Sequence, residues 1–149
     1  MGRTLNSTRV RRGYLPPFDL IKRRAASIDT NGHQNGSGSS TIHLSEDEFK
    51  EIVKLLLRGV DVDEDWYLQE NADVAQAIRD GGFKSARHHF IEEGYFEGRK
   101  PYPFRVNEQW YLRTYPDVAE SIKAGRASSP QQHFQDHGYA EGRLPWDYF

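Results

Sequence analysis

Apolar residues between positions 46 and 58 recur with the period of a helix. Four of them occupy positions i, i+3, i+4 and i+7, which share one helix face: Phe49, Ile52, Val53 and Leu56. Ser45 precedes the run and Glu48 follows it by three residues, the spacing of a capping box. The sequence therefore predicts a helix over residues 46–58. Leu55 and Leu57 lie off the stripe, so a second side is also apolar, and packing on the rest of the chain is favoured over contact with another chain.

The remainder of the chain consists of two copies of one pattern. Residues 62–105 align without a gap on residues 106–149, and 19 of the 44 pairs are identical. "WYLQENADVAQAI" begins at Trp66 and "WYLRTYPDVAESI" begins at Trp110. An internal repeat of this length predicts two similar units that stack on each other.

Capping residues and prolines divide each unit into three short helices. Polar N-cap types precede the first and third helices, at Asp63, Asn107, Ser85 and Ser129. Pro116 and Pro130 suit first helical turns, and glycines at positions 81, 94, 125 and 138 are read as stops. The expected helices span residues 64–70, 72–80 and 86–93, and then 108–114, 116–124 and 130–137.

Such short helices persist only when they pack together, because helix nucleation is costly. We expect each unit to bury a small cluster of apolar residues. The aromatic members of these repeat cores are Trp66, Phe90 and Tyr95 in the first unit and Trp110, Phe134 and Tyr139 in the second. A single unit would be marginal, so the two units are expected to share a face under the helix at 46–58.

The N-terminal segment is a basic arm. Residues 1–29 hold seven Lys or Arg and two Asp, a net charge of +5, whereas residues 30–149 hold thirteen basic and twenty acidic residues, a net charge of −7. Pro16 and Pro17 break regular structure in the arm. The arm residues assigned to partner binding are Arg9, Arg11, Arg12, Tyr14, Phe18, Lys22, Arg23 and Arg24. Their charge suits an anionic surface, and a solvated tail is the alternative.

The predicted fold class is therefore all-α, with a lid helix and two tandem three-helix repeats preceded by an irregular basic arm. We divide the chain into the arm (1–28), a Gly/Asn/Ser linker (29–44), a packing helix (45–61), the first repeat (62–105) and the second repeat (106–149).

The strings "DWYLQENADVAQAI" with "HHFIEEGYFEGRKP", and "QWYLRTYPDVAESI" with "QHFQDHGYAEGRLP", resemble a short bacterial tandem repeat. That repeat reads approximately WYLxxNPDVAxA followed by HYxxHGxxEGRxP, and it occurs beside glycosyltransferase domains and in proteins of surface polysaccharide synthesis. The resemblance covers residues 62–149 and departs from the family at Ala72, where the module prefers proline. It implies an accessory or scaffolding role near exopolysaccharide machinery, and it transfers no catalytic residue.

Side chains that could bind a metal ion or form ion pairs recur at equivalent positions of the two units. His89 and His133 are expected to make one structural hydrogen bond in each unit, and this is favoured over a metal site because no convincing third ligand accompanies His133 and His137. Asp73 recurs as Asp117 and Arg99 as Arg143, which favours an Asp–Arg pair inside each unit. Glu97 and Glu141 are expected to be local partners.

Enzyme signatures are missing from the sequence. The chain has no cysteine, Walker loop, dinucleotide fingerprint, HExxH or GxSxG, so we expect neither an enzyme nor a cofactor or metal. It also has no apolar run of the ~18 residues that span a bilayer, nor a signal peptide, and a cytoplasmic protein is expected.

Three functions follow, in order of preference. The first is a non-catalytic adaptor that binds a protein partner, within a larger assembly or alone. The second is a carbohydrate-binding accessory protein that uses the repeat aromatics, with Trp66 and Trp110 facing outward. The third is nucleic-acid binding through the arm, ranked last because no stacking platform accompanies it. The C-terminal residues Trp146, Tyr148 and Phe149 are a further candidate anchor for a partner, or fold back on the body.

Overall fold

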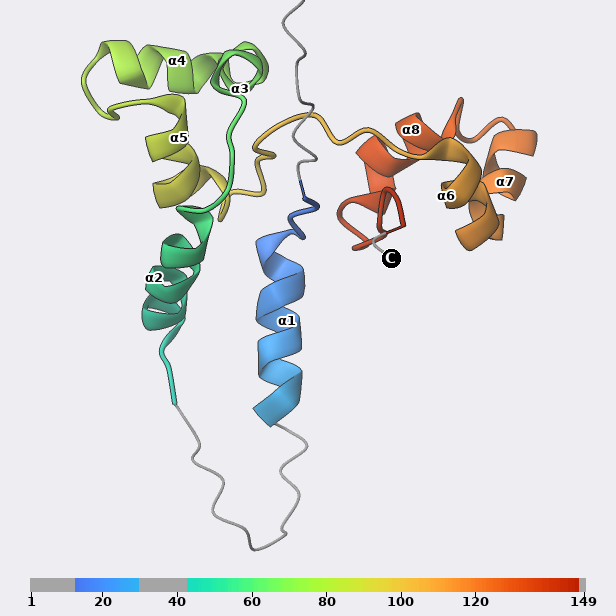
Figure 1. Ribbon diagram of the computed structural model, residues 1–149, viewed down its shortest axis with the longest axis horizontal. Helices are drawn as coiled ribbons and strands as arrows, with labels where there is room; N and C mark the ends of the chain where they lie inside the picture. The colour runs from blue at the N-terminus through green and yellow to red at the C-terminus, as the bar shows by residue number, and fades with distance from the viewer. Residues whose placement is uncertain (1–12, 30–42, 148–149) are drawn as a thin grey trace, which may run out of the picture.

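The computed structural model describes residues 13–29 and 43–147, and every regular element in these ranges is a helix. The all-α class is confirmed. The expected linker falls mostly in residues 30–42, outside the described residues. In Figure 1, α1 lies between the two repeat units, α2 lies beneath the first unit, and the second unit occupies the opposite side.

The helix α1 (Phe18–Asp29) stands where the sequence predicted an irregular arm. The proline pair lies before the helix rather than within it, and the Pro17 carbonyl accepts bonds from the amides of Leu20 (3.1 Å) and Ile21 (3.4 Å). Proline is well tolerated at a helix start because no intrahelical donor is lost there. The prolines therefore begin a helix that they were expected to prevent.

The helix α2 (Glu46–Leu57) begins at the predicted capping box. The Ser45 hydroxyl accepts from the Glu48 amide at 3.2 Å, and the Glu48 carboxylate accepts from the Ser45 amide at 2.8 Å. The buried face differs from the predicted stripe, because Val53 and Leu57 are buried whereas Ile52 and Leu56 are exposed. Apolar residues cover much of the circumference of α2, so the helical periodicity alone does not determine which side packs against the body.

The helices of the two units start at the predicted residues and end within two residues of the predicted ends. The first unit contains α3 (Glu64–Glu70), α4 (Ala72–Arg79) and α5 (Ala86–His89), which continues into a π-helical turn at Phe90–Gly94. The second unit contains α6 (Glu108–Thr114), α7 (Pro116–Lys123) and α8 (Pro130–His133), which continues into a π-helical turn at Phe134–Gly138. The four predicted N-caps each accept a backbone bond, at 3.0–3.2 Å.

Tyrosine, and not tryptophan, lies at the centre of each unit. Tyr67 and Tyr111 are both 0% exposed, whereas Trp66 and Trp110, which the sequence placed in the cores, are half-buried and pack against their edges. The other predicted aromatics, Phe90, Tyr95, Phe134 and Tyr139, are buried. Both residues of each Trp–Tyr pair are large and apolar, so the sequence pattern did not decide which one points inward.

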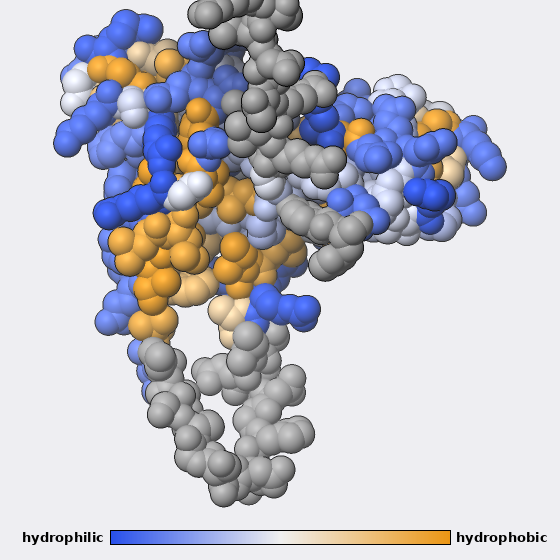
Figure 2. Space-filling model, viewed as in Figure 1, coloured by the Kyte–Doolittle hydropathy of each residue, from blue (hydrophilic) through white to orange (hydrophobic). Residues whose placement is uncertain are grey.

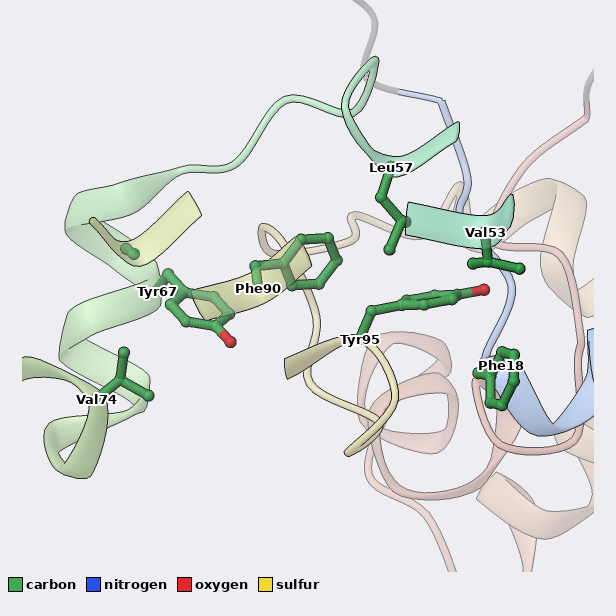
Figure 3. Packing of buried hydrophobic residues seen from close by; sticks show 8 residues of the cluster. Phe18, Val53, Leu57, Tyr67, Val74, Phe90 and Tyr95 are labelled. Atoms are coloured by element: carbon green, nitrogen blue, oxygen red, sulfur yellow. The ribbon is translucent and has the colours of Figure 1, made fainter. Parts of the chain in front are cut away.

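The first cluster joins α1 and α2 to the first unit. Phe18, at 5% exposed, contacts Tyr95 at a ring-centroid distance of 6.1 Å and Phe49 at 5.9 Å. Figure 3 shows the Tyr95 ring between Val53 of α2 and Phe18 of α1. Roughly 1.5 to 3 kcal/mol is gained by burying each such side chain, so α2 is held as a lid on this unit.

The second cluster is completed by the segment that connects the units. Tyr102 and Phe104 are 4% exposed, and Phe104 stacks on Tyr139 at a centroid distance of 5.4 Å. Residues from the end of the first repeat thus complete the core of the second unit. The core of the second unit therefore depends on residues of the first repeat.

The segment before α1 bridges both clusters. Leu15 packs against each of them, and Tyr14 contacts Phe104 at 5.6 Å. The hydroxyl of Tyr95 donates to the Pro16 carbonyl at 2.8 Å, and that of Tyr102 donates to the carbonyl of Gly13. These bonds fix the segment across the body.

The glycines at positions 94 and 138 are the last residues of the π-helical turns, as the sequence predicted for helix stops, and they also permit a close approach of neighbouring side chains. A Cβ atom at Gly94 would collide with the Tyr67 hydroxyl and lie 3.1 Å from His89 Nδ1, and Gly138 stands in the same relation to Tyr111. Gly98 and Gly142 have positive φ angles of 79° and 75°, which only glycine adopts without strain.

Candidate functional site

The most distinctive surface of the protein is apolar and lies on α2. Three large aliphatic side chains of α2 are exposed, Ile52 at 43%, Leu55 at 59% and Leu56 at 71%, and Leu44, which precedes the N-cap of the helix, is exposed at 45%. We call these four residues the outer face of α2. Figure 2 shows apolar surface gathered over α2 and the neighbouring part of α1. A contiguous exposed patch on a well-packed helix is typical of an interaction site.

Charges are segregated along α2. Its first turn carries three acidic residues, Glu46, Asp47 and Glu48, and its basic residues lie further along, with Arg58 as the C-cap. Lys54 bridges Glu51 at 2.8 Å and Glu92 at 2.9 Å, which ties the helix to the first unit. Acidic starts and basic ends both favour a helix through its dipole. The outer face is therefore flanked by negative charge at one end and positive charge at the other.

A cleft of about 460 Å³ lies between the two units. Its walls include Trp66 and Glu70 from the first unit, the connecting residue Lys100, and Phe134 and Gln135 from the second. Trp110 does not line this cleft, since it packs edge-on against Tyr115 at 6.1 Å. Only one of the two repeat tryptophans is therefore placed to contact a ligand here.

The two cations of the cleft differ in how they are held. Arg99 uses most of its donors, because it donates two bonds to Asp73 at 3.0 and 2.7 Å, one to Glu97 at 2.6 Å and one to Asn71 at 2.9 Å. The Lys100 ammonium lies 5.0 Å from the Tyr139 ring centroid, and burial lowers its pKa. Lys100 is thus the cation with spare donors.

The predicted Asp–Arg pairs are present in both units. Arg143 donates to Asp117 at 2.9 and 2.7 Å, in the geometry of Arg99 and Asp73. The hydrogen bonds from Arg99 lower the pKa of Asp73 to about 2, and those from Arg143 lower the pKa of Asp117. These bidentate pairs join the start of the second helix to the end of each unit, which is a structural task.

Each repeat histidine makes the expected structural hydrogen bond. The Tyr67 hydroxyl and His89 Nδ1 are 3.0 Å apart, and Tyr111 and His133 Nδ1 are 3.3 Å apart. Burial, followed by the nearby arginine, lowers the pKa of both histidines, which favours the neutral imidazole.

One group of possible metal ligands occurs in the described part of the chain. Ligand atoms of His89, Glu93 and Glu97 lie within 4.8 Å of one another. Glu97 already binds Arg99, whose positive charge opposes a second cation at this place. We therefore assign the group to the structural network around Arg99.

The arm residues chosen from the sequence are divided by the fold. Tyr14 and Phe18 pack against the body, where Phe18 is buried and Tyr14 is half-buried. Lys22, Arg23 and Arg24 are exposed on α1, and Lys22 pairs with Glu46 of α2 at 2.6 Å. Arg9, Arg11 and Arg12 lie outside the described residues.

The C-terminal segment folds back on the second unit. The Asn107 amide donates to the Pro145 carbonyl at 2.8 Å, and Trp146 packs against the second cluster, 6.5 Å from Phe104. Trp146 is therefore part of the body, whereas Tyr148 and Phe149 lie outside the described residues.

Comparisons with known proteins return no relationship: no family model, curated protein or solved structure matches the chain. In the described residues, no helix is both long and apolar enough to cross a bilayer. Sequence reasoning missed the outer face of α2 because it assigned Ile52 and Leu56 to the core. The sequence feature that could have indicated this exposed face is the run Leu55, Leu56 and Leu57, because three consecutive residues cannot all face one side of a helix.

Proposed function

We propose that this protein is a non-catalytic adaptor or scaffold that binds a protein partner through the outer face of α2. The exposure of Leu55 and Leu56 on a helix fixed to the core is the observation that carries this proposal. Burying four aliphatic side chains against a partner would release apolar surface from water, which is the main favourable term in protein association. The recurrent aromatic residues serve mainly the core, which leaves this aliphatic face as the principal apolar surface.

The cations of α1 supply a second part of the same binding surface. α1 lies beside α2 in Figure 1, and the Lys22–Glu46 pair joins them. Arg23 and Arg24 are exposed near this junction. A partner that covers α2 and carries acidic groups at its rim would meet them, which would increase the rate and selectivity of binding more than its strength.

We further propose a role near exopolysaccharide or glycosyltransferase machinery, which the resemblance of the repeats to the bacterial module supports, and the cytoplasm as the location. This part of the proposal depends on the motif strings alone. Fractionation of host cells and co-purification with a glycosyltransferase would test it.

Affinity capture from the native host tests the binding surface. The full chain is compared with a Leu55→Lys/Leu56→Lys variant and with a Trp66→Ala control that alters the cleft. We expect a host protein that the wild type and the control retain and the α2 variant loses. Retention by all three chains, with the α2 variant folded by circular dichroism, would contradict the proposal.

Carbohydrate binding at the cleft between the units is a second candidate. Trp66 lines this cleft together with Glu70 and Lys100, a combination of an aromatic face and polar groups that suits a sugar. Titration with host polysaccharide fragments should change tryptophan fluorescence in the wild type and not in Trp66→Phe. Trp110→Phe is the matched control, because that indole is outside the cleft. An unchanged spectrum in the wild type would remove this candidate.

A further inference from the structure

We propose that the outer face of α2 pairs with the same face of a second copy of this chain, with the two α2 helices antiparallel about a two-fold axis beside Leu55. This inference rests on the proposed function, because it names the partner of the same face. It depends on the position of two opposite charges relative to the exposed leucines.

Glu51 and Arg58 lie on one flank of the outer face. They are seven residues apart, about two helical turns, so they project from almost the same side of α2. Leu55 lies between them in the sequence and is 59% exposed. Each of the three side chains is therefore available at the edge of the apolar patch.

An antiparallel pair makes these charges complementary. With a two-fold axis perpendicular to the helices, the charged flanks of both copies lie on the same side of the dimer. The two flanks run in opposite directions along that side. Glu51 of one copy then faces Arg58 of the other, and the symmetric contact repeats this pair, so that two ion pairs enclose the two Leu55 side chains. A parallel pair would separate these flanks and set the two acidic first turns side by side, which is repulsive.

Both charged groups are free to make such contacts. The Glu51 side chain is 70% exposed even though its Oε1 atom pairs with Lys54 at 2.8 Å. Arg58 is exposed, and among the described residues no ion pair involves its guanidinium. The face is thus self-complementary in both apolar and charged groups, which favours a second copy over an unrelated partner.

The patch is small, so the dimer is expected to be weak. Three aliphatic side chains per copy lie near the axis, Ile52, Leu55 and Leu56, which is at the low end of protein interface sizes, and the extent of dimerisation depends on concentration. Leu55 lies beside the two-fold axis, so dimer affinity should be most sensitive to substitution at this position. Replacing Leu55 with lysine should weaken association at least about tenfold.

Sedimentation equilibrium of the full chain, over about 1 to 200 µM, measures this association. We expect the wild type to dimerise and the Leu55→Lys variant to remain monomeric. Glu51→Arg and Arg58→Glu should each weaken the dimer, because each creates two like-charged contacts. An equimolar mixture of these two variants should regain wild-type association as a heterodimer. Arg113→Glu, an exposed charge reversal on α6, is the control and should dimerise as the wild type does.

Different results contradict different statements. A wild type that stays monomeric at the highest concentration, or a dimer that Leu55→Lys leaves intact, overturns the pairing. A mixture of the charge variants that fails to associate overturns the antiparallel register. A monomeric wild type that still captures a host protein, where the α2 variant does not, overturns self-pairing and leaves the proposed function standing. Capture that is independent of α2 overturns the proposed function itself.

Discussion

Alanine at position 94 tests the packing at the centre of the first unit. Gly94 is buried in the π-helical turn, where an added methyl group would collide with the Tyr67 hydroxyl and crowd His89 Nδ1 at 3.1 Å. Both groups are buried, and they share the hydrogen bond that fixes α3 against α5. The methyl group must therefore displace a packed side chain or the backbone of the turn.

The magnitude follows from three contributions. Overpacking of a core costs about 1–3 kcal/mol, and disturbing the Tyr67–His89 bond adds about 1 kcal/mol. Replacing glycine in a helical segment returns about 0.5–1 kcal/mol of backbone entropy. We expect Gly94→Ala to lower the free energy of unfolding by about 2 kcal/mol, which corresponds to a decrease in Tm of roughly 4 to 8 °C.

Thermal and urea unfolding, followed by circular dichroism, measure this loss. Gly59→Ala is the matched control, because its nearest atom would be the Leu56 carbonyl oxygen at an ordinary 3.5 Å. It should change stability by less than about 0.5 kcal/mol. Tyr67→Phe removes the hydroxyl that Gly94→Ala meets, so the double variant should be about 1 kcal/mol more stable than additivity allows. Equal stability of the two alanine variants, or strict additivity in the double variant, would refute the packing.

Three further predictions address charge and the N-terminal segment. Burial lowers the pKa of His89 and His133 in the folded state, so the unfolded state binds more protons below about pH 6.5. The free energy of unfolding should therefore fall from pH 7 to pH 5. A double His→Gln variant should show a weaker pH dependence in urea titrations. Arg99→Met should raise the pKa of Asp73 from about 2 toward the ordinary aspartate value of 3.8, as measured by carboxyl NMR titration. Phe18→Ala should cost about 3–5 kcal/mol in urea unfolding, a loss that a freely moving arm would not show.

The helix starts were predictable because their signals are local. Asp63, Ser85 and their counterparts cap the helices that follow them, and such a cap depends only on residues three positions away. The Asp–Arg pairs were predictable for a different reason, because both members recur at the same spacing in each unit. The repeat therefore supplied information on contacts that a single copy would not give.

The remaining features depend on tertiary contacts that no local pattern encodes. α1 is held by Phe18 against Tyr95, across 77 residues of sequence, so its proline-rich start was interpreted as a break. The choice of Tyr67 over Trp66 depends on how α3 docks on α5, because the hydroxyl must reach His89. The outer face of α2 was missed for the same reason, since the neighbours of Val53 and Leu57 select the side that packs.

Photo-crosslinking tests most directly the claim that a protein partner contacts the outer face of α2. A photoreactive phenylalanine analogue is placed at Leu55, which is exposed, and in a second chain at Trp66, which lines the cleft. The account predicts that illumination in a host extract joins the Leu55 chain to a protein, either another copy or a different one, and that the Trp66 chain gives no such product. Protein crosslinks from position 66 alone, or from neither position, would contradict it.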